Sequence, residues 1–139
     1  MDGDMQWLLD RTLILELTSR YNRCFDDGDA EGFAAAFTED GVMEVDGTFR
    51  VDGREALAEM VRHTPYGVVH VTVDATVEVD GDRAVQDVKL LVLSRPGADA
   101  PGGATRLTNS GRYHDELVRT PQGWRFAHRT AYLDGGFGR

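Results

Sequence analysis

The N-terminal part of the chain carries apolar residues at the spacing of helices. They recur every three or four positions over residues 5–27, and Gly28 then supplies a residue that commonly ends a helix. Asp29 can cap a second helix that runs through Phe37. The pattern therefore predicts a helical hairpin. Its inner face is expected to consist of Leu8, Ile14, Leu15, Leu17, Tyr21, Cys24, Phe25, Phe33, Ala34 and Phe37.

The rest of the chain alternates between β-branched runs and turn residues. Residues 42–45 and 48–51 flank Asp46 and Gly47, a pair that suits a tight hairpin turn. Asp52 and Glu55 have the spacing of a capping box, which predicts a third helix ending near residue 64. Two long hairpins are expected to follow, residues 68–79 with 84–93 and residues 106–119 with 124–133. This order predicts an α+β fold with helices packed on one face of an antiparallel sheet.

Two segments outside these elements are expected to be irregular. Residues 94–104 are rich in Pro, Gly and Ala and form a connection that can order over a pocket. Residues 135–139 are expected to be a frayed tail. Large apolar side chains are expected to form the core or the pocket wall: Trp7, Phe33, Phe37, Met60, Trp124 and Phe126.

Length and composition fit one folded domain over residues 1–139. The chain has 139 residues, a common size for a single hydrophobic core, and 41% of them are hydrophobic. Its formal net charge of -9 is spread along the chain, so most of the surface would repel a phosphate backbone. No nucleic-acid partner is expected.

Cysteine use and the N-terminus indicate a cytoplasmic protein. Cys24 is the sole cysteine, which excludes an internal disulfide and a multi-cysteine metal site and fits a reducing compartment. Its place in an apolar helical stretch favours a buried, inert thiol. The N-terminus is acidic where a signal peptide is basic, and no apolar run approaches membrane-spanning length, so no membrane association is expected.

Four sequence stretches are informative in their order and spacing. They are YNRCFDDGD at 21–29, FTEDG at 37–41, HVTVD at 70–74 running on to VDGDRA at 79–84, and GRYHDEL at 111–117 leading to GWRF at 123–126. Together they resemble the SnoaL-like family of the nuclear transport factor 2-like superfamily over nearly the whole chain. The resemblance implies a cone-shaped fold in which a strongly curved sheet wraps three helices and leaves an apolar cavity.

The resemblance also implies a site. Several members, among them bile-acid 7α-dehydratase, scytalone dehydratase and lindane dehydrochlorinase, pair an Asp at the end of the first helix with a His on the first long strand. Asp26 and His70 stand at the matching places, and Tyr21 matches a Tyr five residues before the Asp of bile-acid 7α-dehydratase. Asp74 departs from the Asn of many relatives, which changes the expected charge of the pocket. Relatives commonly associate through the sheet, so a homodimer or homotrimer is expected.

Asp26 and His70 indicate acid/base chemistry. A carboxylate in the last turn of a helix faces the negative end of the helix dipole, so Asp26 requires a partner. Bound to one ring nitrogen of His70, it would hold the tautomer and aim the other nitrogen into the cavity as a general base. Strict alternation, however, puts His70 on the polar face of its strand, opposite Val71 and Val77. Either that face lines the pocket mouth or a β-bulge changes sides.

Further side chains are candidates for roles in the pocket. Tyr21 lies on the inner stripe of its helix, where its hydroxyl can donate a proton or stabilise an oxyanion. Arg129 can hold an anionic or carbonyl group through paired hydrogen bonds. The other candidates for substrate binding are Asp74, Asn109, Tyr113 and His128.

Motifs for metal or nucleotide chemistry are absent from the sequence, which has no HExxH, cysteine cluster, Walker-type loop or GxGxxG. The first hypothesis is therefore a cofactor-independent dehydratase, isomerase or cyclase for a hydrophobic, carbonyl-bearing or polycyclic small molecule, with Asp26 and His70 as general base. A second is a non-catalytic module that holds a hydrophobic ligand in the pocket or joins a partner through the sheet. A third is a SnoaL-type aldol cyclase, in which an aspartate is essential and His70 only assists.

Overall fold

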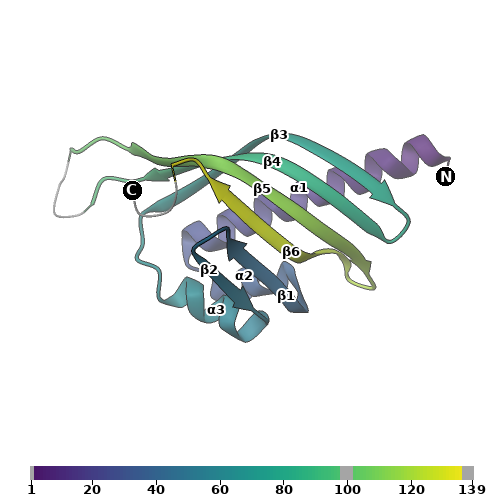
Figure 1. The fold of residues 1–139 in the computed structure, drawn as a ribbon, viewed down its shortest axis with the longest axis horizontal. Helices are drawn as coiled ribbons and strands as arrows, with labels where there is room; N and C mark the ends of the chain where they lie inside the picture. Colours follow the sequence, from purple (N-terminus) through teal and green to yellow (C-terminus); the bar gives the residue numbers. More distant parts are fainter. Residues whose placement is uncertain (1, 98–101, 136–139) are drawn as a thin grey trace.

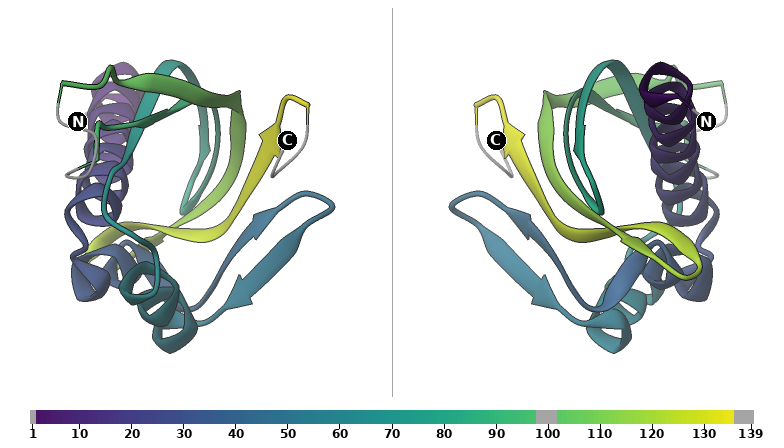
Figure 2. Two further views of the ribbon diagram at one scale, coloured as in Figure 1. Left: turned by 90° about the vertical axis from the view of Figure 1, so that its left-hand side faces the viewer. Right: turned by 90° about the vertical axis from the view of Figure 1, so that its right-hand side faces the viewer.

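Three helices pack against one face of a bent six-stranded sheet (Figure 1). The computed structural model describes residues 2–97 and 102–135, so the centre of the 94–104 connection and nearly all of the predicted tail lie outside the described residues. Seen end-on (Figure 2), the sheet curves strongly beside the helices. We call the side of the sheet that faces the helices its inner face. The predicted α+β class and the curved sheet are confirmed.

The first two helices end and begin as their capping residues predict. α1 (Gly3–Asp27) ends at Gly28, whose φ of 74° lies in the left-handed region that glycine adopts readily. Asp29 caps α2 (Ala30–Ala35) by accepting a hydrogen bond from the backbone N–H of Gly32. No helix in the described part of the chain is long and apolar enough to cross a membrane.

Two predicted details after α2 are wrong. Phe37 is the first residue of a strand and not the last residue of the helix. α3 (Arg54–Arg62) begins without a side-chain cap, so the predicted capping box of Asp52 and Glu55 does not form. The reason is that the helix begins one residue later than predicted. Its N-cap is Gly53, which has no side chain to accept a hydrogen bond, and the carboxylate of Asp52 accepts from Nε of Arg50 at 2.8 Å.

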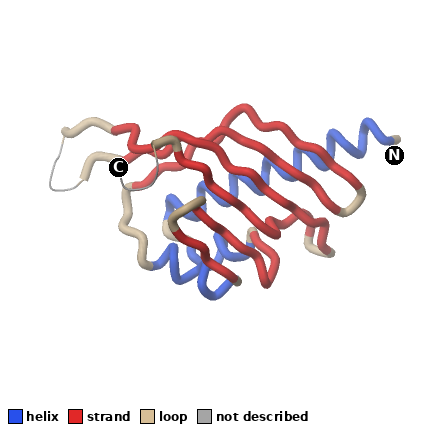
Figure 3. The backbone as a smooth tube through the Cα atoms, in the orientation of Figure 1, coloured by secondary structure: helices blue, strands red, loops and turns tan. Residues whose placement is uncertain are grey.

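The sheet has the strand order β2, β1, β6, β5, β4, β3 (Figure 3). The bounds are β1 (Phe37–Val45), β2 (Phe49–Asp52), β3 (Val68–Asp80), β4 (Arg83–Ser94), β5 (Arg106–Thr120) and β6 (Gly123–Leu133). All neighbours are antiparallel except β1 and β6, which run parallel, so the prediction of a wholly antiparallel sheet is wrong in this pairing. An apolar pattern indicates which face of a strand is buried, and no hairpin turn joins β1 to β6 to fix their direction.

A β-bulge in β3 resolves the question of which way His70 faces. Pairing with β4 shifts between Val73 and Thr76, and the intervening Asp74 adopts a φ of 56°. The extra residue moves Val77 to the inner face, where His70 already lies. The inner face of β3 therefore carries polar side chains such as His70 before the bulge and apolar side chains such as Val77 after it.

The core fills the space between the inner face and the helices. Four aromatic side chains expected there are almost completely buried: Phe33, Phe37, Trp124 and Phe126. Trp7 and Leu8 are 42% and 52% exposed, so their predicted inward positions are wrong. The first turns of α1 project beyond the sheet (Figure 1) and have no inner face to pack against.

Candidate active site

A largely apolar cavity of about 400 Å³ lies between the helices and the inner face of the sheet. A volume of this size is within the range that holds small organic ligands. Predicted candidates His70, Tyr21, Asn109 and Tyr113 lie in its wall. The other lining residues are Phe25, Met43, Val45, Phe49, Met60, Thr64, Val68, Leu90, Val92, Thr108, Ala131 and Leu133.

Asp26 and His70 are in direct contact across the junction of α1 and β3. Oδ1 of Asp26 is 2.6 Å from Nδ1 of His70, and both carboxylate oxygens accept from the backbone N–H of His70, at 3.0 and 3.1 Å. The two side chains are only 10% and 8% exposed. Three contacts from one residue thus hold a carboxylate that the end of the helix dipole disfavours.

This contact determines which nitrogen of His70 can act on a ligand. With Asp26 accepting at Nδ1, the proton of the neutral ring resides there and Nε2 carries the lone pair. Nε2 makes no hydrogen bond within residues 2–97 and 102–135, and the ring lines the cavity. Phe25 packs against the same ring at 4.6 Å between centroids. His70 is therefore oriented, with one ring nitrogen available to a bound molecule.

Two tyrosines form another part of the cavity wall. Tyr21 from α1 and Tyr113 from β5 place their hydroxyl oxygens 3.4 Å apart, and both side chains are buried. The ring of Tyr21 meets the ring of His70 edge-on, with centroids 6.3 Å apart. Burial raises the pKa of Tyr113 and raises that of Tyr21 well above its ordinary value, so both hydroxyls are protonated at neutral pH.

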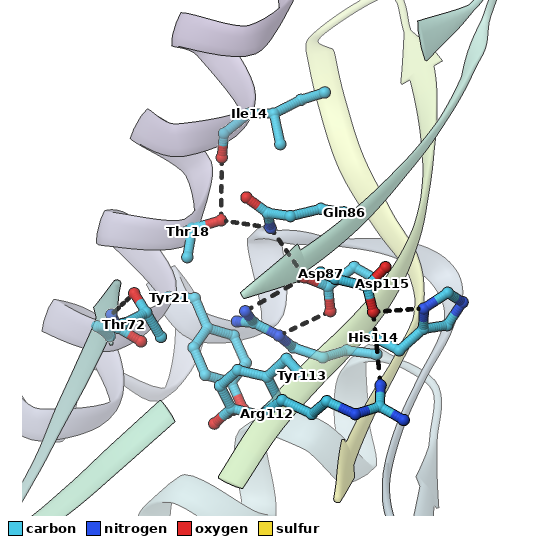
Figure 4. A network of polar contacts seen from close by, with 12 residues as sticks. Ile14, Thr18, Tyr21, Thr72, Gln86, Asp87, Arg112, Tyr113, His114 and Asp115 are labelled. Carbon is cyan, nitrogen blue, oxygen red and sulfur yellow. Dashed lines mark hydrogen bonds and ion pairs between the residues drawn. The ribbon is translucent and has the colours of Figure 1, made fainter. Parts of the chain in front are cut away.

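A buried polar network lies behind the tyrosines. Nε of Arg129 is 2.9 Å from Oδ1 of Asp115 on the neighbouring strand, an ion-pair contact without hydrogen-bond alignment, and Nη2 donates to Oδ2 at 3.3 Å. Gln86 donates to the same carboxylate and to the hydroxyl of Thr18, as Figure 4 shows. Burial raises the pKa of Asp115, while Arg129 and Gln86 oppose that rise. The network joins α1 to three strands of the inner face, β4, β5 and β6.

Three predicted substrate-binding residues do not line this cavity. Arg129 lies behind the tyrosines, as described. Asp74 sits in the bulge, is exposed and approaches Lys89 at 3.4 Å, because the bulge turns its side chain from the inner face. His128 points to the outer face of the sheet, where its Nε2 is 2.5 Å from Glu44.

A family model for the SnoaL-like domain matches residues 6–130. The chain belongs to the SnoaL-like domain family. The predicted resemblance is thus confirmed over most of the chain. A comparison of the chain's sequence with curated proteins found no match.

Solved structures place this SnoaL-like domain among proteins of the same fold. Rv3472(D26N), a protein of unknown function from Mycobacterium tuberculosis, is 32% identical, with a TM-score of 0.85 over 96% of this chain and 77% of that chain. An NTF2-like protein with a cystatin-like fold from Novosphingobium aromaticivorans is 30% identical, with a TM-score of 0.85 over 97% and 89% of the two chains. ActVI-ORFA from Streptomyces coelicolor is 22% identical, with a TM-score of 0.78 over 91% of this chain and 98% of that chain. At this identity the likeness is one of fold alone.

Sequence reasoning missed the polar network of this SnoaL-like domain. Asp115 and Gln86 are fully buried, although nothing in their local sequence marks them as special. The one available signal for Asp115 is alternation, since it falls between the inward-facing Tyr113 and Leu117. No group of three or more His, Cys, Asp or Glu side chains in the described part of the chain is arranged to hold a metal ion.

Proposed function

We propose that this SnoaL-like domain is a cofactor-independent acid/base enzyme that removes a proton from a hydrophobic, carbonyl-bearing small molecule. The observation that supports it most is the 2.6 Å contact of Asp26 with His70 at the wall of an apolar cavity. A solvated aspartate and an ordinary strand histidine would not be buried together at the cost of desolvating both.

In the proposed reaction His70 is the general base. Its Nε2 takes a proton from the carbon beside the carbonyl. The C–H electron pair forms the C=C bond of an enolate, and the π pair of the carbonyl moves onto its oxygen, which becomes an oxyanion. Asp26 holds the Nδ1–H tautomer and stabilises the imidazolium that forms. The hydroxyl of Tyr21 donates a hydrogen bond to the oxyanion.

Dehydration is the favoured outcome, ahead of isomerisation and cyclisation. In dehydration the electron pair of the enolate expels a hydroxyl group from the next carbon, and the imidazolium of His70 returns its proton so that water leaves. In isomerisation the imidazolium returns the proton to a different carbon. Both sequences leave His70 neutral and need no oxidant, reductant or metal ion.

Two alternatives receive less support. An aspartate-based cyclase requires a carboxylate free to act on the ligand, whereas both oxygens of Asp26 are bonded to His70 and Asp26 is not part of the cavity wall. A purely binding module has no need of the pair of Asp26 and His70 beside its ligand. The enzyme hypothesis would have failed if the two side chains were well apart and no cavity lay between helices and sheet, and neither condition is met.

The proposal can be tested before the natural substrate is known. Apolar ketones of graded size, such as cyclohexanone and 2-tetralone, are incubated with the protein in deuterated water, and deuterium uptake beside the carbonyl is followed by NMR. The protein should accelerate exchange of at least one ketone that the cavity admits. His70→Gln should lower that rate by about a hundredfold or more, the usual effect of a general base.

His128→Gln is the matched control, because this histidine also contacts a carboxylate but lies on the outer face. It should exchange ketones at the wild-type rate. Equal rates for wild type and His70→Gln, with both proteins folded, would show that His70 is not the base.

A further inference from the structure

The hydroxyls of Tyr21 and Tyr113 have the spacing of a site for one shared acceptor (Figure 4). An O–H···O hydrogen bond is usually about 2.7 Å long, so hydroxyl oxygens 3.4 Å apart bond only weakly to each other. Two donors at that separation can each reach a single oxygen at the normal distance. Both residues line the cavity, which makes such an oxygen that of a bound molecule.

Arg129 lies against the faces of both tyrosine rings. Its Cζ is 3.6 Å from the ring centroid of Tyr113 and 4.2 Å from that of Tyr21, well within the range of cation–π attraction. A positive charge beneath a phenol ring stabilises negative charge on its oxygen, which makes the hydroxyl a stronger donor. The one guanidinium therefore acts on both hydroxyls at once.

The burial of Arg129 makes this action strong. Its side chain is fully buried, and its counter-ion Asp115 is buried beside it. Nη1 has no hydrogen-bond partner within residues 2–97 and 102–135. The charge of Arg129 also opposes the effect of burial on the pKa of Tyr21 and of Tyr113. Because water is excluded, this charge is weakly screened at the rings.

We infer that Tyr21 and Tyr113 form a two-donor site for an oxyanion, and that Arg129 is the positioning residue that strengthens both donors through their rings. The inference rests on the proposed function, since the oxyanion is the carbonyl oxygen after His70 has removed a proton. Under this inference the substrate class is narrowed to enolisable ketones. Their oxygen binds the tyrosines while the acidic carbon faces His70.

A phenolate is the simplest mimic of such an enolate, since it has the same charged oxygen on a flat apolar body. We choose 4-nitrophenol as the probe because its two ionisation states absorb at different wavelengths. At a single pH where half of the free probe is ionised, absorbance of the bound probe reports the fraction bound as phenolate. The wild-type protein should bind phenolate in preference to phenol.

Tyr113→Phe should lower this preference by about tenfold, since it keeps the ring over Arg129 but removes one donor to a charged oxygen. Tyr21→Phe should have a similar effect. The paired change Arg129→Met with Asp115→Leu removes both buried charges and should lower the preference about threefold or more while both hydroxyls remain. If that double variant does not fold, the two phenylalanine variants still decide whether the tyrosines are the donors.

Two controls separate an electronic effect from damage to the cavity. Arg112→Met removes a cation that lies 4.3 Å from the ring of Tyr132 on the outer face, and it should leave the phenolate preference unchanged. 4-Nitroanisole has the shape of the probe but cannot ionise, so its affinity should be similar in wild type and in each folded variant.

The outcomes distinguish this inference from the proposed function. A phenolate preference that Tyr113→Phe reduces supports the two-donor site, even if ketone exchange is absent and the proposed function fails. Ketone exchange without a phenolate preference overturns the two-donor site and leaves His70 as the base. Absence of binding by 4-nitrophenol also overturns it, as does a preference that neither tyrosine variant changes. An unchanged preference in a folded Arg129→Met, Asp115→Leu protein overturns the role of Arg129.

Discussion

Helix α1 carries one buried carboxylate in its N-terminal third and another in its last turn, and the two differ in whether a partner keeps a free functional atom. Asp10 is 1% exposed and accepts from Arg119 at 2.8 and 3.0 Å, from Trp124 at 3.1 Å and from Gln6 at 3.1 Å. In the part of the chain that the structure describes, in contrast, all hydrogen bonds of the Asp26 carboxylate come from the ring and backbone of His70.

A buried ion pair alone does not indicate a reactive site, as these two carboxylates show. The partners of Asp10 tie α1 to β5 and β6, and none of them lines the cavity. The partner of Asp26 has a second ring nitrogen and does line the cavity. Reactivity requires an oriented group with a spare functional atom facing a space that a ligand can enter.

The largest expected difference between the two carboxylates is in rate. Asp26→Asn replaces an acceptor at Nδ1 of His70 with an amide that can present a donor there, which favours the wrong tautomer. Deuterium exchange of a responsive ketone should fall by about a hundredfold or more. Asp10→Asn should retain the wild-type rate. Equal losses in the two variants would contradict a separate role for Asp26.

The loss of unfolding free energy should be larger at Asp10 than at Asp26, the reverse of the order expected for the rates. Asp10→Asn weakens several charge-assisted hydrogen bonds at once and should cost about 2 kcal/mol of unfolding free energy. Asp26→Asn should cost about 1 kcal/mol, because an amide oxygen still accepts from the backbone of His70. Urea unfolding followed by circular dichroism measures both values. A larger cost at Asp26 than at Asp10 would disagree with the hydrogen bonds observed.

The stability contributed by Asp10 should disappear in acid. The hydrogen bond from Arg119 is the main cause that lowers the pKa of Asp10 below its ordinary value of 3.8, so the ionised carboxylate stabilises the folded state. This contribution is complete above pH 3.8 and is lost as the pH falls through the lower folded-state pKa. The stability gap between wild type and Asp10→Asn should therefore narrow below pH 3.8 in urea titrations. A gap that is constant with pH would show that Asp10 acts without its charge.

The smallest effect is expected at Asp74, a third carboxylate that sequence analysis placed near the ligand. Its partner Lys89 and its own side chain are 70% and 68% exposed, and such surface pairs contribute little. Asp74→Asn should change the unfolding free energy by less than about 0.5 kcal/mol and leave ketone exchange unaltered. A clear loss of exchange would place Asp74 in the site after all.

Much of the fold was predictable from local patterns. Gly28 and Asp29 set the boundary between α1 and α2, and the long hairpins fall within one residue of the predicted ranges. The direction of β1 beside β6 was not predictable, because it depends on pairing between distant segments. The bulge at Asp74 was anticipated only as one of two alternatives, since alternation in a single strand cannot show where register shifts.

The site was predictable to the extent that a resemblance supplied it. Asp26, His70 and Tyr21 were named from matching positions, and the structure brings them together. The position of Arg129 behind the tyrosines, opposite Asp115, depends on the register of β5 and β6, which no local motif encodes. The same register puts the neighbouring His128 on the outer face, although both residues were candidates for substrate binding.

The protonation state of His70 tests the central claim most directly. Two-bond ¹H–¹⁵N NMR spectra of uniformly labelled protein at neutral pH report which ring nitrogen of each histidine carries the proton. We predict a proton on Nδ1 of His70 and none on Nε2, and loss of this pattern in Asp26→Asn. A proton on Nε2 of His70 in the wild-type protein would contradict its proposed role as the base that Asp26 holds ready for a ligand.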